Sequence, residues 1–247
     1  MSSLVAADGI RIHYDSVGDG PSVVLLHGIS ANGEMNWEWT GIAPTVRAAG
    51  FHTVTIDQRG HGRSDKPHEP TAYDDDLFAS DVSAVIDDLD IEDCALVGYS
   101  MGALMALRAV PHELRVNALV LGGIGMPSAD RDLRESTASA LETEEPDLLQ
   151  PGEPRSIREY ADATGADRRA LAALQRGRSD APYEFDAVTV PTLVIAGRDD
   201  DLADDAGELA GALPHATFVQ VPGDHASALI EPEFREGVVS FLSSALR

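Results

Sequence analysis

Short, continuous apolar runs recur along the chain, and the segments between them carry apolar residues at helical spacing. The runs cover residues 23–26, 54–57, 95–98, 118–121, 192–195 and 217–221. Continuous apolar runs are typical of parallel strands, because helices cover both faces of a parallel sheet. Strands that alternate with helices favour βαβ units. The pattern therefore predicts an α/β fold built around a mostly parallel sheet.

Other segments predict the elements around that sheet. Residues 10–14 alternate apolar and polar side chains and precede turn-forming residues at 18–21, which indicates a hairpin strand at a sheet edge. Helical spacing predicts helices over 76–90 and 101–110, the second of which ends before a proline. A last helix is expected from Pro232, since proline is favoured at the start of a helix.

Residues 126–190 interrupt the alternation of strands and helices. The segment is far longer than the usual connection of roughly 2–6 residues between a helix and a strand. It contains five prolines and two helix-like pieces, 131–142 and 168–176. A flexible linker would be an alternative interpretation. We expect a small helical cap, so that residues 1–125 and 191–247 form the core domain and residues 126–190 are an insertion.

The strongest chemical signal is the sequence Gly98-Tyr99-Ser100-Met101-Gly102, which lies between a predicted strand and a predicted helix. In a G-x-S-x-G turn the serine adopts a strained backbone conformation, and the small residues on either side let the chain pass close to itself. The serine hydroxyl then projects above the carboxyl end of the sheet. Ser100 is therefore the candidate nucleophile.

A serine hydroxyl is a weak nucleophile, so it needs a base and an acid that orients the base. His225 follows the last predicted strand, at the sheet edge where open α/β folds gather their sites. The acid is expected among Asp199, Asp200 and Asp201, which lie between serine and histidine in chain order. The residues alone do not choose among the three. Because no histidine or regularly spaced oxygen ligand is nearby, a metal site is not expected there.

Acyl transfer also needs two amide donors for the oxyanion of the tetrahedral intermediate. Met101, directly after the serine, is expected to supply one N–H group. Ile29 is expected to supply the other, because Gly28 lets the loop after the first buried strand approach closely. His27 could be interpreted as a base, but we favour a role in holding this loop by hydrogen bonds.

These motifs resemble those of the α/β-hydrolase fold superfamily, and the resemblance covers essentially the whole chain outside the predicted cap. His27-Gly28 resembles the family's oxyanion motif, and residues 57–64 resemble the D-x-R-G-x-G-x-S loop of its esterase, haloperoxidase and dehalogenase branch. Residues 98–102 resemble its nucleophile elbow, and residues 223–225 its histidine loop. The resemblance implies the α/β-hydrolase fold, with a mostly parallel eight-stranded sheet flanked by helices.

The resemblance also implies site residues. The family's G-x-x-D pattern, placed on residues 197–200, implies Asp200 as the acid, with Asp199 as the fallback. Haloalkane dehalogenases and epoxide hydrolases of this fold have aspartate at the elbow, where this chain has Ser100. Hydroxynitrile lyases depend on a lysine near the acid, and Lys66 lies elsewhere in the sequence.

The function implied is that of a serine hydrolase that cleaves a small or medium carboxylic ester or lactone through an acyl-enzyme on Ser100, with no cofactor and no metal. Cofactor-free haloperoxidases or perhydrolases, carbon–carbon bond hydrolases and enol-lactonases have the same triad and remain alternatives. A ligand receptor of the same fold is a more remote alternative. We expect Trp37 and Met126 to line the substrate pocket.

The amino-acid composition limits the classes of binding partner that we expect for this protein. The 247 residues include 18 Lys and Arg against 42 Asp and Glu, for a net charge of −24. So acidic a surface repels phosphate backbones and anionic headgroups. We therefore expect a small-molecule substrate, with no nucleic-acid or membrane partner, and leave the oligomeric state open. The single cysteine, Cys94, allows no intrachain disulfide, and residues 1–15 do not resemble a signal peptide, so a cytoplasmic location is expected.

The excess of acidic residues has two explanations, adaptation to high salt and a GC-rich genome. Genome composition accounts for arginine in place of lysine, but not for so large a net charge. If salt adaptation is the cause, the melting temperature will rise in molar KCl, because salt screens the repulsion among carboxylates. Thermal denaturation across a KCl series measures this, and a melting temperature insensitive to KCl would leave genome composition alone.

Overall fold

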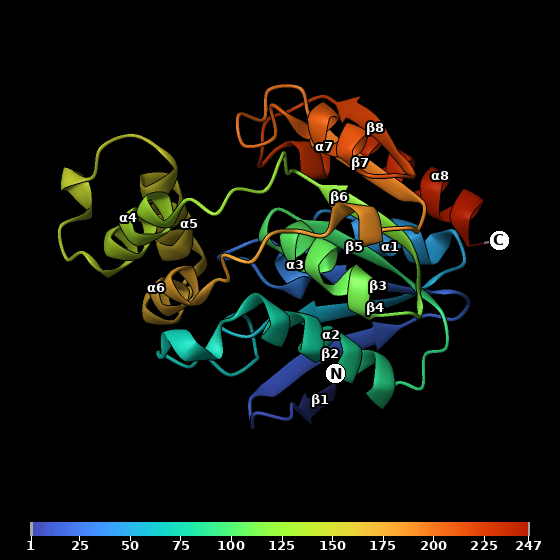
Figure 1. Ribbon diagram of the computed structural model, residues 1–247, viewed down its shortest axis with the longest axis horizontal. Helices are drawn as coiled ribbons and strands as arrows, with labels where there is room; N and C mark the ends of the chain where they lie inside the picture. The colour runs from blue at the N-terminus through green and yellow to red at the C-terminus, as the bar shows by residue number, and fades with distance from the viewer. Residues whose placement is uncertain (1, 247) are drawn as a thin grey trace.

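The computed structural model describes residues 2–246, which form one sheet with helices on both faces (Figure 1). The strand order is β1-β2-β4-β3-β5-β6-β7-β8. The strands are β1 (Ser2–Val5), β2 (Arg11–Val17), β3 (Ser22–Leu26), β4 (His52–Asp57), β5 (Cys94–Tyr99), β6 (Val116–Gly122), β7 (Thr192–Gly197) and β8 (Ala216–Val221). All six continuous apolar runs identified in the sequence are strands of this sheet.

The sheet is mostly parallel, as predicted. Strands β4, β3, β5, β6, β7 and β8 pair in parallel, whereas β2 is antiparallel to both β1 and β4. The predicted edge position of residues 10–14 is wrong, because β2 is the second strand and β1 forms the edge. Strand β1 has four residues, none of them buried, so it leaves almost no hydrophobic pattern in the sequence.

Side chains of the central strands alternate between two separate cores. In β3, Val23 and Leu25 pack with α1 (Ile42–Ala48) and α8 (Pro232–Ala245). Val24 and Leu26 pack on the other face with α2 (Asp75–Asp88), α3 (Met101–Ala109) and α7 (Ala206–Ala212). Figure 1 shows α3 in front of the central strands. Because each strand is buried on both faces, its sequence is apolar at consecutive positions.

The predicted helices are present with small shifts at their ends. Those expected over 76–90, over 101–110 and from Pro232 correspond to α2, α3 and α8. The short helices α1 and α7, of seven residues each, were not predicted from the sequence. Within residues 2–246, no helix has the length and apolar character needed to cross a membrane.

The segment 126–190 is helical rather than a linker. It contains α4 (Arg131–Glu142), α5 (Glu153–Thr164) and α6 (Arg168–Gly177), which lie together to the left of the sheet in Figure 1. Five buried side chains form a small apolar cluster of their own: Ala138, Leu141, Ala161, Leu171 and Ala172.

Charged contacts attach this insertion to the core at two sides. Arg178, just after α6, donates to Asp75 of α2 at 2.6 Å, and the Asp75 side chain is 1% exposed. His68 lies 3.0 Å from Asp167, the residue before α6. At the other end, the amide of Met126 donates to Asp205 at 2.9 Å. The insertion therefore has a defined position relative to the sheet.

Candidate active site

Ser100 lies at the sharp turn between β5 and α3. Its φ of +53° and ψ of −122° place it in a region that residues with a side chain rarely adopt. The Ser100 amide donates to the carbonyl of Gly122 in the neighbouring strand β6 at 2.8 Å, which holds the turn against the sheet. The strained turn that the G-x-S-x-G sequence predicts is therefore present.

The two glycines of the turn are required by close backbone contacts. A Cβ atom at Gly98 would lie 2.5 Å from the amide nitrogen of Ala103. A Cβ atom at Gly102 would lie 2.6 Å from the carbonyl oxygen of His27 and closer still to that of Leu26. The start of α3 thus rests directly on the end of β3, and only glycine allows this approach.

Three predicted site residues form a continuous hydrogen-bond chain. Nε2 of His225 lies 3.1 Å from Oγ of Ser100, and Nδ1 of His225 lies 3.0 and 3.1 Å from the two carboxyl oxygens of Asp200. Since a carboxylate only accepts, Nδ1 carries the proton, and Nε2 is left to accept the Ser100 hydroxyl. This is the geometry that a serine nucleophile needs for its activation.

The structure also distinguishes the three neighbouring aspartates. Asp200 is 2% exposed, and its carboxylate additionally accepts the amide of Leu202 at 3.0 Å. Asp199 and Asp201 are exposed to solvent. The amide of Asp199 donates to Gly223 at 3.0 Å, so the loop after β7 is bound to the loop that carries the histidine. The contact with His225 is therefore made by Asp200 and not by its neighbours.

Tyr99, which the sequence did not single out, supports His225. Its hydroxyl donates to the carbonyl oxygen of His225 at 2.6 Å, and the two rings pack with centroids 5.3 Å apart. On the other side, Asp224 accepts the amides of Ala226 and Ser227 at 3.1 and 2.8 Å. Hydrogen bonds from Ser227 lower the pKa of Asp224, because they stabilise its charged carboxylate. Both contacts hold the imidazole in place.

His27 holds the loop after β3, as favoured from the sequence. It is fully buried, and burial lowers its pKa. Nε2 of His27 accepts the amide of Gln58 at 3.0 Å, so the ring proton is on Nδ1, which donates to the carbonyl of Gly28 at 2.8 Å. The ring of His61 packs edge-on at 4.9 Å, and burial lowers the pKa of His61 to about 3. Both histidines are therefore neutral near pH 7.

The two amides predicted to bind an oxyanion flank Ser100. Met101 is the first residue of α3, where N–H groups have no acceptor within the helix. A Cβ atom at Gly28 would lie 3.3 Å from Cβ of Ser100, so the turn between Gly28 and Ile29 passes beside the serine. Both residues thus lie close to Ser100 along the chain or in space, and their role as oxyanion donors stays a prediction.

The sequence-based assignment of Trp37 to the substrate pocket is wrong. Trp37 has no exposed surface and packs in the core on the α1 and α8 face of the sheet. The loop after β3 turns back against this face, so the indole serves as an anchor for the loop. Met126 is 37% exposed at the start of the insertion, and its contact with substrate stays a prediction.

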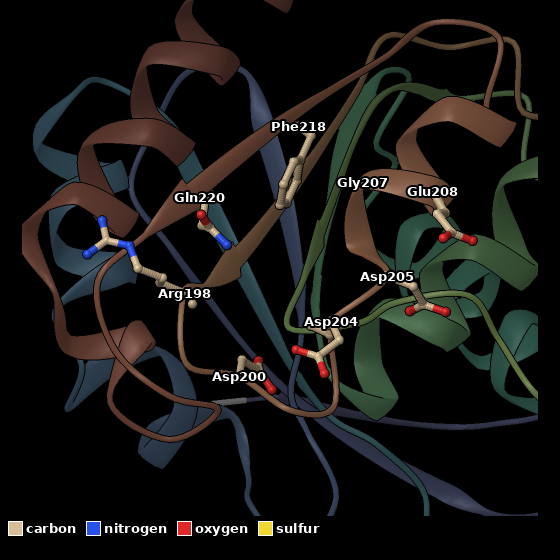
Figure 2. A pocket seen from close by; sticks show the side chains of 10 residues that line it. Arg198, Asp200, Asp204, Asp205, Gly207, Glu208, Phe218 and Gln220 are labelled. Atoms are coloured by element: carbon tan, nitrogen blue, oxygen red, sulfur yellow. The ribbon is translucent and has the colours of Figure 1, made fainter.

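A cavity of about 290 Å³ lies beside Asp200 but is lined by neither Ser100 nor His225. Figure 2 shows Asp205 and Glu208 on its α7 side, with Gln220 and Arg198 across from them. It is therefore separate from the reacting hydroxyl. In residues 2–246, no group of three or more His, Cys, Asp or Glu side chains is arranged to hold a metal ion.

Comparison with known proteins identifies the family to which this fold belongs. Residues 21–177 match the model of a family described as the alpha/beta hydrolase fold. A non-heme chloroperoxidase of Kitasatospora aureofaciens is 39% identical over 102 residues, which cover 41% of this chain and 35% of that protein. Epoxide hydrolase 3 of Siraitia grosvenorii is 35% identical over 102 residues, which cover 41% of this chain and 31% of the relative. These matches thus span about a third of each curated relative.

A solved structure matches nearly the whole chain. It belongs to a hydrolase from Pseudomonas aeruginosa PA01 and superposes with a TM-score of 0.81 at 26% identity. The match covers 98% of this chain and 97% of the other. The similarity therefore includes both the sheet and the insertion.

The crowding at Gly102 leads to a stability prediction. We expect Gly102→Ala to destabilise the protein by about 1–3 kcal/mol, because the added methyl group would overlap the carbonyls at the end of β3. Gly211→Ala in α7 is the matched control, since no atom lies within 4 Å of its added Cβ atom. Alanine should leave stability there unchanged or raise it by up to about 1 kcal/mol. Urea unfolding measures both, and equal stability of the two variants would contradict the proposed crowding.

Proposed function

Because the chain belongs to the α/β-hydrolase fold family, we propose that it is a serine hydrolase that cleaves a small or medium carboxylic ester or lactone. The observation that carries the proposal is the hydrogen-bond chain from Ser100 through His225 to Asp200. The serine at the elbow separates this chain from the epoxide hydrolases of the fold, in which aspartate takes that position.

The reaction proceeds in two steps. Ser100 attacks the ester carbonyl while Nε2 of His225 takes the hydroxyl proton, and the same proton then passes to the departing alkoxide as the acyl-enzyme forms. Water next attacks the acyl group, with His225 as the base, and the carboxylic acid leaves as the proton returns to Ser100. Asp200 keeps the imidazole in the required tautomer and stabilises its protonated form.

The negative oxygen of each tetrahedral intermediate is bound by the amides of Ile29 and Met101. The proposal is supported by the position of Gly28, the residue before Ile29, against Ser100, and by the position of Met101 as the first residue of α3. Backbone donors of this kind need no reorganisation when charge develops, and each contributes roughly 3–4 kcal/mol to transition-state stabilisation.

Electrostatics also bear on the choice of substrate, because Glu153 of the insertion interacts with His225. Burial raises the pKa of Glu153, at the start of α5, and the charge of His225 opposes that rise, so the Glu153 carboxyl lies within electrostatic range of the imidazole. The net charge of −24 favours neutral over anionic substrates. A neutral ester or lactone of small or medium size is the substrate class we propose.

Ester turnover tests the proposal. We expect the protein to hydrolyse p-nitrophenyl acetate or butyrate and Ser100→Ala to reduce kcat by a factor of about 10⁴ or more, because the nucleophile is lost. Release of p-nitrophenolate measures both proteins. Equal turnover of wild type and Ser100→Ala would refute the assignment.

Two aspartates give a matched control for that experiment. Asp200→Asn should lower kcat by roughly four orders of magnitude, since an amide favours the wrong imidazole tautomer. Asp199→Asn should leave kcat within about twofold, because substitutions at exposed positions away from such contacts have small effects. The reverse result would assign the acid to Asp199.

A second candidate function is that of a cofactor-free perhydrolase or haloperoxidase. The observation that favours it is the 39% identity, over 102 residues, with a protein named non-heme chloroperoxidase. In this reaction hydrogen peroxide replaces water as the nucleophile that attacks the acyl-enzyme, and the product is a peracid that oxidises halide.

Peroxide dependence separates the two candidates. With acetate, bromide and hydrogen peroxide, a perhydrolase should brominate monochlorodimedone at a rate comparable to its ester turnover, and Ser100→Ala should abolish both activities. A protein that hydrolyses esters without Ser100-dependent bromination is a hydrolase only.

A further inference from the structure

The peptide that carries the Ile29 amide is held from two sides. The carbonyl of Gly28 accepts Nδ1 of His27 at 2.8 Å and the amide of Ala31 at 3.3 Å. The amide of Gly28 donates to Oδ1 of Asn36 at 3.0 Å. Because a peptide unit is planar, fixing the direction of the Gly28 carbonyl also fixes the direction of the Ile29 N–H group. The two sets of bonds together leave Gly28 little freedom in φ and ψ.

Asn36 is well placed to fix this loop. It is 6% exposed and lies in a short π-helix, η1 (Glu34–Glu38), of a kind often found at functional sites. The hydroxyl of Thr40 donates to the Asn36 carbonyl at 2.7 Å. The next residue is Trp37, which is fully buried in the core. The backbone of Asn36 is therefore anchored next to a buried core residue.

The amide NH₂ group of the Asn36 side chain indicates that stability alone does not explain asparagine at this position. Its Nδ2 group is buried and finds no hydrogen-bond partner among residues 2–246. A buried donor without a partner destabilises a protein by roughly 1–3 kcal/mol. An apolar side chain of the same size would avoid this penalty, but it could not accept the Gly28 amide. The acceptor oxygen is thus the property that distinguishes asparagine here.

We propose that Asn36 is a positioning residue for acyl transfer, which holds Gly28 so that the Ile29 amide points at the oxyanion beside Ser100. This inference rests on the proposed function, because it concerns the transition state of the same reaction. Asn36 itself has no contact with the substrate, since its amide is enclosed by protein. Its effect is exerted through the Gly28 backbone.

Two substitutions and one control test the proposal. Asn36→Leu keeps the size of the side chain but removes the acceptor, whereas Asn36→Asp keeps an acceptor oxygen in either protonation state. The control is Asn32→Leu, in the same loop, because Asn32 accepts the amide of Met35 at 2.9 Å rather than that of Gly28. Each protein is assayed for kcat and KM with p-nitrophenyl butyrate, and for inhibition by a trifluoromethyl ketone, whose hemiketal oxygen occupies the oxyanion position.

We expect Asn36→Leu to lower kcat by about 10- to 100-fold with KM within about threefold, because misplacing one oxyanion donor weakens transition-state binding only. Its inhibition constant for the ketone should rise by a similar factor. Asn36→Asp should recover most of kcat, and Asn32→Leu should stay within about threefold of wild type. Circular dichroism and the melting temperature show whether each variant is folded. If Asn36→Leu does not fold, Asn36→Ser replaces it, because the serine side chain is too short for its oxygen to reach the Gly28 amide.

The outcomes separate this inference from the proposed function. The role of Asn36 is overturned if folded Asn36→Leu has unchanged kcat and ketone affinity, or if Asn32→Leu shows an equal loss. In either case, ester hydrolysis by wild type still supports the serine mechanism. A wild type that neither hydrolyses esters nor reacts at Ser100 with a fluorophosphonate overturns the proposed function, and the role of Asn36 with it.

Discussion

The close approach between the start of α3 and the end of β3 is the constraint on which the site depends. Gly102 rests on the carbonyls of Leu26 and His27, and this contact holds Ser100 at a φ of +53° above the sheet. The same contact brings the loop after β3 beside the serine. One backbone crossing therefore places both the candidate nucleophile and a candidate oxyanion donor, and the strain at Ser100 is balanced by the packing of two central strands.

Hydrogen bonds hold the loops around this crossing in place. The loop after β7 is bound to the loop after β8 through the amide of Asp199, and Tyr99 of β5 holds the carbonyl of His225. The loop after β3 is held by His27 and Gln58. Because these contacts are backbone hydrogen bonds or involve buried side chains, they fix the candidate catalytic groups before any substrate binds, which the proposed mechanism requires for electrostatic preorganisation.

The acidic character of the chain acts mostly outside the candidate catalytic groups. Several basic side chains form specific ion pairs within the protein. Arg59 binds Asp81 in the interior, and Arg178 binds Asp75 between the insertion and α2. The remaining carboxylates include those that line the cavity beside Asp200. Under the proposed function, the negative field of these carboxylates would favour neutral over anionic substrates.

Local patterns in the sequence were sufficient for every strand except β1, for the helices α2, α3 and α8, and for the elbow. Continuous apolar runs identify buried parallel strands, and glycines around Ser100 identify the turn, because both properties depend on a few adjacent residues. The tertiary structure decided which aspartate meets His225, placed Trp37 in the core, and brought Asn36 to Gly28. The spacing of apolar residues in a loop does not tell which face of the sheet these residues will contact. The contact between Ser100 and His225 joins residues 125 positions apart, and only the order of strands in the sheet creates it.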